Sequence, residues 1–195
     1  ILYRERQPGR ATGTPWAGIA IRHREQPVAE APERPSYAVN EQYPQVTKQW
    51  SYASEANVIS TPAVGGQRII FGNQQGTVIA LDRKKGRKKW TYHTGGAIFS
   101  SPAVQGRRVV LGSGDGYIYC LEAQQGKLLW KLKTGAAVLG SPAIAGDTVF
   151  IGGSDHSFRA IDLLSGSVYW QFDGLQGPVV STPLLYRGRV IFGAW

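Results

Sequence analysis

The segment Ala80-Leu81-Asp82-Arg83-Lys84-Lys85-Gly86-Arg87-Lys88-Lys89-Trp90 has two further copies along the chain, each forty residues after the previous one. Every copy keeps a small residue, a carboxylate, a glycine and a tryptophan at the same four positions. A repeat of this length is typical of a structural unit that cannot bury its apolar face alone and therefore stacks on its neighbours. The later copies have Cys120, Glu122, Gly126 and Trp130, and then Ala160, Asp162, Gly166 and Trp170; Trp50 precedes Trp90 by the same spacing.

Each unit also contains short apolar runs separated by turn residues, which predicts strands. In the second unit we expect strands within 97–104 and over 108–112, 117–122 and 127–132. A two-helix repeat is excluded, because Pro and Gly recur about every ten residues and leave no room for a helix of three turns. Four antiparallel strands in about forty residues form one blade of a β-propeller. We therefore predict an all-β fold, a partial β-propeller in residues 46–195 with about three complete blades and a truncated last one.

The propeller pattern does not extend to the first 45 residues. Residues 1–24 alternate apolar and polar side chains on both sides of a Pro- and Gly-containing turn, which predicts a hairpin that is the tail of a preceding domain. Residues 25–45 begin with a Pro-, Glu- and Ala-rich run and are predicted to form an extended linker. The chain starts at Ile1 and stops in the middle of a unit at Trp195. We interpret it as a segment of a larger protein, in which further sequence or another copy completes the propeller.

Composition limits the classes of protein. The apolar fraction of 42% is sufficient for a core. One cysteine, Cys120, excludes an internal disulfide framework and a thiolate metal cluster. No apolar run is long enough for a transmembrane helix, and no secretion-signal pattern occurs.

Two columns of the repeat have structural explanations. The small residues Ala80, Cys120 and Ala160 are expected where neighbouring blades pack closely, so Cys120 is predicted to be a buried, unreactive thiol rather than a nucleophile. The carboxylates Asp82, Glu122 and Asp162 are expected to accept backbone N–H groups in the turn that follows each of them. Carboxylates on three separate blades do not form a catalytic pair.

The Ala-x-Asp, Gly and Trp pattern of residues 80–90 and 160–170 resembles the tryptophan-docking motif of the PQQ-like, or quinoprotein-type, β-propeller family. The resemblance covers residues 46 to 195 and implies that each tryptophan packs against a peptide of the adjacent blade, behind a glycine turn. The blade-docking residues that it implies are Gly86, Trp90, Gly126, Trp130, Gly166 and Trp170.

The family contains both redox enzymes and non-catalytic scaffolds. The enzymes hold PQQ and Ca²⁺ with an Asp base, Glu and Asn ligands and, in the larger alcohol dehydrogenases, a vicinal disulfide. This chain has no adjacent cysteine pair. The expected starts of its inner strands, 57–59, 97–99 and 137–139, form a mostly apolar rim, whereas Ca²⁺ needs six or more oxygen ligands. We therefore predict no catalytic, cofactor-binding or metal-binding residue, and no cofactor, in this segment.

The resemblance leads to one main functional hypothesis and two alternatives. The main hypothesis is a non-catalytic scaffold that binds a protein partner, in the manner of the family's outer-membrane assembly lipoproteins, in a periplasmic or other extracytoplasmic location. One alternative is the C-terminal accessory propeller of a calcineurin-like metallophosphoesterase, whose catalytic motifs are absent from this segment. The other is a fragment of a PQQ-dependent dehydrogenase.

A basic run stands out within the formal net charge of +9. One interpretation is a patch for an anionic partner; the other is a solvated turn on the rim of a blade. Specific nucleic-acid recognition is not expected, because it needs stacking aromatic side chains on an open face and Trp90 is assigned to blade packing. His23, His93 and His156 lack metal-ligand spacing and are assigned structural or surface roles. The basic residues are Arg83, Lys84, Lys85, Arg87, Lys88 and Lys89.

Overall fold

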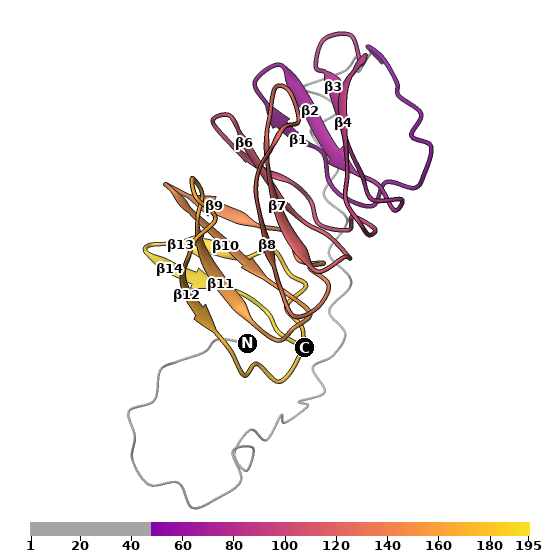
Figure 1. Ribbon diagram of the computed structural model, residues 1–195. Coiled ribbons are helices and arrows are strands. Elements are labelled where there is room, and N and C mark those ends of the chain that lie inside the picture. Colours follow the sequence, from indigo (N-terminus) through magenta and orange to yellow (C-terminus); the bar gives the residue numbers. More distant parts are fainter. Residues whose placement is uncertain (1–47) are drawn as a thin grey trace, which may run out of the picture. The chain divides into compact units, whose positions relative to one another are not determined.

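The computed structural model describes residues 48–195, and its secondary structure there is entirely β (Figure 1). The predictions for residues 1–24 and 25–45 lie outside this part of the chain. The strands form three four-stranded antiparallel sheets in sequence order and one two-stranded sheet. No helix in residues 48–195 is long and apolar enough to cross a membrane. The first sheet contains β1 (Ala63–Gly65), β2 (Arg68–Gly72), β3 (Thr77–Asp82) and β4 (Lys88–His93); the second β5 (Ala103–Gln105), β6 (Arg108–Gly112), β7 (Tyr117–Glu122) and β8 (Leu128–Lys133); the third β9 (Ala143–Ala145), β10 (Thr148–Gly152), β11 (Phe158–Asp162) and β12 (Val168–Phe172); and the last β13 (Leu184–Tyr186) and β14 (Arg189–Ile191).

The first strand of each sheet is shorter than the sequence suggested. Strand pairing begins at Ala63, Ala103 and Ala143, so the predicted inner-strand starts at 57–59, 97–99 and 137–139 were wrong. The reason is the proline that precedes each strand, since proline has no N–H for the ladder and restricts the residue before it. The segments before the prolines instead make side-chain bonds: the Ser100 Oγ accepts the Gly112 N–H at 3.0 Å.

Each docking tryptophan has a small residue as its cross-strand partner. Trp90 on β4 lies opposite Ala80 on β3, and the register shifts immediately after Ala80. The second and third sheets repeat both features, with Trp130 opposite Cys120 and Trp170 opposite Ala160. Cross-strand neighbours share one face of a sheet, so the small side chain leaves room for the indole. The small residues Ala80, Cys120 and Ala160 therefore make room for the tryptophan of their own sheet, in addition to the predicted close packing between neighbouring blades.

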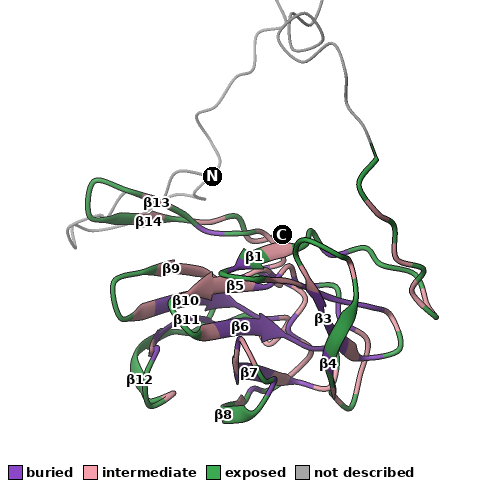
Figure 2. Cartoon of the chain, turned by 90° about the horizontal axis from the view of Figure 1, so that it is seen from above, coloured by how far each residue is buried: buried purple, intermediate pink, exposed green. Residues whose placement is uncertain are grey.

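The core lies between the sheets rather than within one of them. One cluster joins the first and second sheets and another joins the second and third. Ala80, Cys120 and Ala160 are completely buried. Figure 2 shows this as largely buried middle strands and an exposed last strand in each four-stranded sheet. Each sheet thus buries both faces only when it has a neighbour on each side, as expected for a stacked repeat.

The last two strands cover part of the third sheet. Phe192, just after β14, stacks on Phe158 of β11 with ring centroids 3.9 Å apart and an angle of 4°. Ser181 takes the place of Ser100 in this unit, since its Oγ accepts the Gly193 N–H at 3.1 Å. The two-stranded sheet therefore repeats the inner half of a blade.

Candidate functional site

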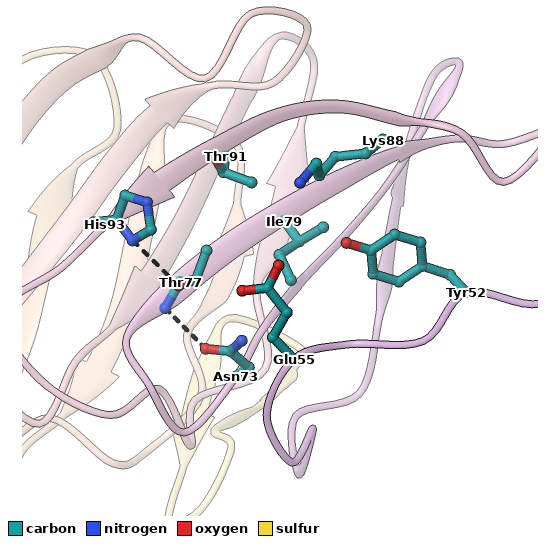
Figure 3. Close-up of a pocket in the computed structure, with 8 residues that line it drawn as sticks. All are labelled: Tyr52, Glu55, Asn73, Thr77, Ile79, Lys88, Thr91 and His93. Carbon is teal, nitrogen blue, oxygen red and sulfur yellow. Dashed lines mark hydrogen bonds between the residues drawn. The ribbon is translucent and has the colours of Figure 1, made fainter.

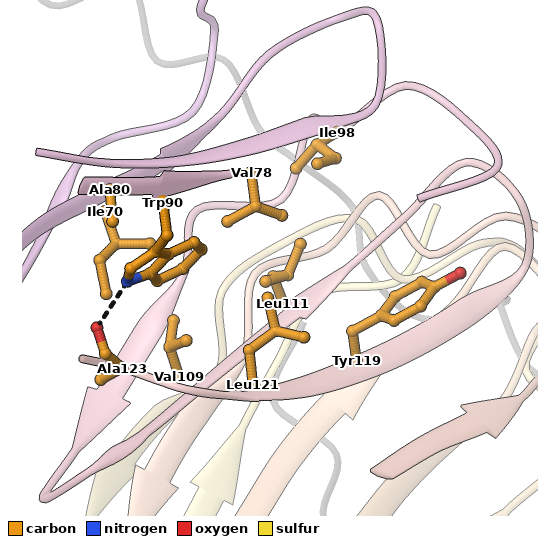
Figure 4. Packing of buried hydrophobic residues seen from close by; sticks show 10 residues of the cluster. All are labelled: Ile70, Val78, Ala80, Trp90, Ile98, Val109, Leu111, Tyr119, Leu121 and Ala123. Atoms are coloured by element: carbon orange, nitrogen blue, oxygen red, sulfur yellow. Dashed lines mark hydrogen bonds between the residues drawn. The ribbon is translucent and has the colours of Figure 1, made fainter. Parts of the chain in front are cut away.

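The tryptophans connect consecutive sheets through one repeated contact. The Trp90 Nε1–H donates to the Ala123 carbonyl at 3.1 Å (Figure 4). Gly126, three residues later, has φ +73°, and a Cβ there would lie 2.5 Å from the indole Cε3. The glycine is needed both for its left-handed conformation and because the ring lies directly on its backbone. Trp90 therefore contacts the glycine turn of the following unit rather than the glycine of its own motif.

The same contact occurs on both sides of this one. Trp50 donates to the Arg83 carbonyl at 3.1 Å and lies against Gly86. Trp130 donates to the Leu163 carbonyl at 3.0 Å and lies against Gly166. Trp50 lies outside any strand, yet it occupies the docking position on the first sheet.

Trp170 differs from the other three tryptophans. It is 45% exposed, and its indole N–H has no hydrogen bond to any residue in the described part of the chain. Its ring packs instead near Phe150 and Phe158 of its own sheet, with centroids 6.1 Å away in both cases. The third sheet thus carries a docking tryptophan without a docked glycine turn.

The three carboxylates at the ends of β3, β7 and β11 hold the turns on which these tryptophans dock. The Asp82 Oδ1 accepts the backbone N–H groups of Lys84 and Lys85 at 3.1 and 2.9 Å. The hydrogen bond from Lys85 is the main cause of the lowered pKa of Asp82. Glu122 and Asp162 make the corresponding pairs of bonds. Since each carboxylate is occupied by its own turn, these groups are structural.

Another carboxylate, that of Asp155, cross-links the second and third sheets. Asp155 accepts two hydrogen bonds from the Arg159 guanidinium, at 3.2 and 2.5 Å, and the Gly135 N–H of the preceding unit at 2.9 Å. Arg159 is only 5% exposed and also donates its Nε–H to Gln171 at 2.8 Å. Burial alone would raise the pKa of Asp155, but the hydrogen bonds from Arg159 and Gly135 outweigh it and lower the pKa below 3.8.

This pair predicts an acid-sensitive junction. A carboxyl whose pKa is lowered in the folded state contributes stability above its unfolded pKa and loses it as the pH falls through the folded value. We expect Asp155→Asn to flatten the decline of the urea midpoint between about pH 5 and about pH 2, since the variant has no charge to lose. Asp147→Asn, at an exposed position, is the matched control and should keep the wild-type slope. Equal slopes for both variants would contradict the assignment.

The first sheet has a polar pocket on the face that points away from the second sheet. It has a volume of about 240 Å³ and is shown in Figure 3. In the next unit this place is filled by Tyr119, whose hydroxyl donates to Asp115 at 2.7 Å. The first unit has the smaller Ile79 at that position, which leaves the hollow. The lining residues are Tyr52, Glu55, Asn73, Thr77, Ile79, Lys88, Thr91 and His93.

Few of the pocket's polar groups are fixed in position. The Thr77 hydroxyl and His93 Nδ1 are 3.2 Å apart, and the Asn73 Oδ1 accepts the Thr77 N–H at 3.0 Å. Glu55, Lys88 and His93 are exposed. The pocket is thus a polar hollow on the side of a blade, in which Asn73 is buried and held by its own turn while the charged lining residues are exposed.

An apolar column follows the inner side of the sheets. β1, β5, β9 and β13 contact one another in that order, and one apolar residue lies shortly before each of these strands. Ile59 is 60% exposed and Phe99 38% exposed, and the third and fourth members are partly exposed. The members of this apolar column are Ile59, Phe99, Leu139 and Val180.

Hydrogen bonds between neighbouring units fix the column. The Thr61 N–H donates to the Ser101 Oγ at 2.8 Å, and the Ser101 N–H donates to the Ser141 Oγ at 2.8 Å. Each bond joins equivalent positions forty residues apart. Because these bonds tie together the backbones next to Ile59, Phe99 and Leu139, this part of the column is a preformed surface.

The remaining candidate residues are dispersed. Cys120 is completely buried, and burial raises the pKa of its thiol to about 12, so the group stays protonated. His156 replaces the turn glycine and has φ 60°, which is uncommon for a non-glycine residue. In residues 48–195 no group of three or more His, Cys, Asp or Glu side chains could hold a metal ion. The six residues of the basic run are all exposed, on the turn between β3 and β4 and at the start of β4.

Stacked four-stranded sheets, joined by tryptophan–glycine contacts, define the described chain as a partial β-propeller with tryptophan-docked blades. It belongs to the PQQ-like propeller family described as outer membrane protein assembly factor BamB, whose model matches residues 47–100 and 93–194. No curated protein matches the sequence.

Solved structures show the same fold. BamB from Moraxella catarrhalis is 23% identical with a TM-score of 0.68, and the match covers 75% of this chain and 46% of that one. The computationally designed Ika4 protein is 20% identical with a TM-score of 0.69, covering 77% and 93% of the two chains. A europium-containing methanol dehydrogenase is 24% identical with a TM-score of 0.55, covering 63% and 26%. The chain therefore spans less than half the length of the BamB and methanol dehydrogenase chains.

Proposed function

We propose that this propeller segment is a non-catalytic, protein-binding scaffold of the BamB type, acting outside the cytoplasm. The observation that carries the proposal is the apolar column of Ile59, Phe99, Leu139 and Val180. Exposed apolar residues in a contiguous patch mark interaction sites, and a preformed surface loses little conformational entropy on binding. The family supports the location and the class of partner, since its name describes an assembly factor for outer membrane proteins.

A photo-crosslinking amino acid placed at Phe99 of the full-length protein tests this proposal. We expect a covalent adduct with one discrete protein partner in cells, identified by mass spectrometry, because Phe99 lies in the column. The same amino acid at Leu164, which is 53% exposed on the turn between β11 and β12, is the matched control and should give no such adduct.

Two outcomes would contradict the proposal. Adducts at Leu164 but none at Phe99 would place the binding surface elsewhere. Binding of PQQ and Ca²⁺ by the full-length protein, with dye-linked oxidation of an alcohol or sugar, would assign it to the catalytic branch of the family. Divalent-metal-dependent phosphatase activity that this segment alone lacks would instead support an accessory role beside a metallophosphoesterase.

A further inference from the structure

The turn between β3 and β4 carries far more positive charge than the fold requires. The second and third units form the same turn, with a left-handed glycine at φ 73° and 77° against 66° for Gly86. Over the six positions occupied by cations in the first unit, the second unit has one lysine, Lys127, and the third has no charged residue. The second and third units therefore show that mostly neutral side chains form this turn as well as the cations of the first unit do.

These cations have little internal compensation. Asp82 is the carboxylate of the turn, and its Oδ1 is engaged by two backbone N–H groups. Its Oδ2 lies 3.9 Å from the Lys89 Nζ, which makes a weak surface ion pair. Since like charges in a short segment repel one another, the cluster opposes the stability of its own hairpin. A role in binding explains why the charge is concentrated on this one turn.

The geometry of the turn points to a flat anionic partner. The backbone is held by the Asp82 bonds and by the Trp50 indole on the Arg83 carbonyl, so the cations project from a rigid, exposed hairpin tip. The nearby indoles of Trp50 and Trp90 are docked on glycines and cannot stack on nucleic-acid bases. Cations on an exposed hairpin tip can all approach a flat anionic surface, whereas the tip does not enclose a nucleic-acid strand.

We propose that the basic tip, Arg83–Lys89, binds the surface of an anionic lipid bilayer. Each cation near an anionic membrane adds to the attraction, and the attraction is screened by salt. This proposal is independent of the protein-binding function of the apolar column, since the tip and the column lie on different strand connections.

Co-sedimentation of the full-length protein with lipid vesicles tests it. We expect binding to phosphatidylcholine vesicles that contain about 30% phosphatidylglycerol, no binding to pure phosphatidylcholine, and weakening as NaCl rises from about 50 to about 300 mM. The triple variant Lys84→Glu, Lys85→Glu and Lys88→Glu should lose affinity by about a hundredfold or more. Lys127→Glu, Lys131→Glu and Lys133→Glu together change the net charge equally on the next blade and should have a much smaller effect.

A second variant tests whether a loss of binding comes from the loss of charge rather than from misfolding of the triple variant. Lys84→Gln with Lys85→Gln gives the tip the residues that the second unit has at Gln124 and Gln125, so it should fold normally and lose affinity by about tenfold or more. The proposal is overturned if wild type does not bind the anionic vesicles, if either tip variant binds as well as wild type, or if the blade-two control loses as much affinity as the tip triple variant. Tighter binding to a duplex oligonucleotide than to the vesicles would identify nucleic acid as the partner and would also overturn it.

Discussion

Replacing Trp90 with alanine is expected to lower the free energy of unfolding of this chain by about 3–5 kcal/mol. Trp90 is only 9% exposed and belongs to the core cluster that joins the first and second sheets. Its removal leaves a cavity in that cluster and deprives the buried Ala123 carbonyl of its indole donor, and both changes are destabilising. Urea denaturation followed by circular dichroism measures the effect.

Trp170→Ala is the matched control for this prediction. Trp170 has the same place in its unit and the same cross-strand partner type, but it is 45% exposed and has no docked turn in the described part of the chain. We expect a smaller loss of about 1–3 kcal/mol, since only part of the Trp170 side chain is buried and its indole N–H has no hydrogen bond to lose in the described part of the chain. Equal losses for Trp90→Ala and Trp170→Ala would show that docking contributes nothing beyond packing within one sheet.

Gly126→Ala is expected to destabilise the chain by about 2–5 kcal/mol, the sum of a conformational and a steric cost. The left-handed conformation at φ +73° accounts for about 1–2 kcal/mol of this for a residue with a Cβ. The rest comes from overpacking, because that Cβ would lie 2.5 Å from the Trp90 ring and forces the indole to move. The free energy of unfolding is again obtained from urea denaturation.

Gly106→Ala separates these two contributions. Gly106 has φ +58°, and a Cβ added there would have no atom within 4 Å, so only the conformational cost of about 1–2 kcal/mol applies. In a Trp90→Ala background, Gly126→Ala should cost no more than Gly106→Ala, because the ring that it collides with is gone. Additivity of Trp90→Ala and Gly126→Ala would contradict a direct contact between the two residues.

The fold could be predicted well from the sequence because the same pattern of strand and turn residues occurs in several repeats. The spacing of Trp90, Trp130 and Trp170 and the turn glycines required four short strands per unit, and the sheets have that form. The inner strands were predicted too early, because the apolar pattern at 97–99 continues through a proline that pairing cannot cross. Ile59 and Phe99 are nonetheless exposed, as the predicted apolar rim implied.

The candidate surfaces depended on contacts that periodicity does not encode. The pocket of the first sheet exists because Ile79 stands where the next unit has a large tyrosine, and only the packing of that tyrosine against Asp115 reveals the difference. The Asp155–Arg159 pair is local, since the two residues are four apart, but its bond to the Gly135 N–H depends on how the second and third sheets stack. Neither residue had a role in the sequence-based predictions.

The sequence by itself determined the repeating unit: its strands, its glycine turns, its small residue and its tryptophan, because these follow from local backbone geometry and from the alternation of side chains along a strand. The tertiary structure decided what each tryptophan touches. Trp50, Trp90 and Trp130 reach a carbonyl 33 residues ahead, in the next unit, whereas Trp170 reaches none in the described chain. Copies of the same motif thus differ in burial and bonding, because a docking contact needs a second sheet placed against the first. That placement is a property of the stack rather than of any one unit.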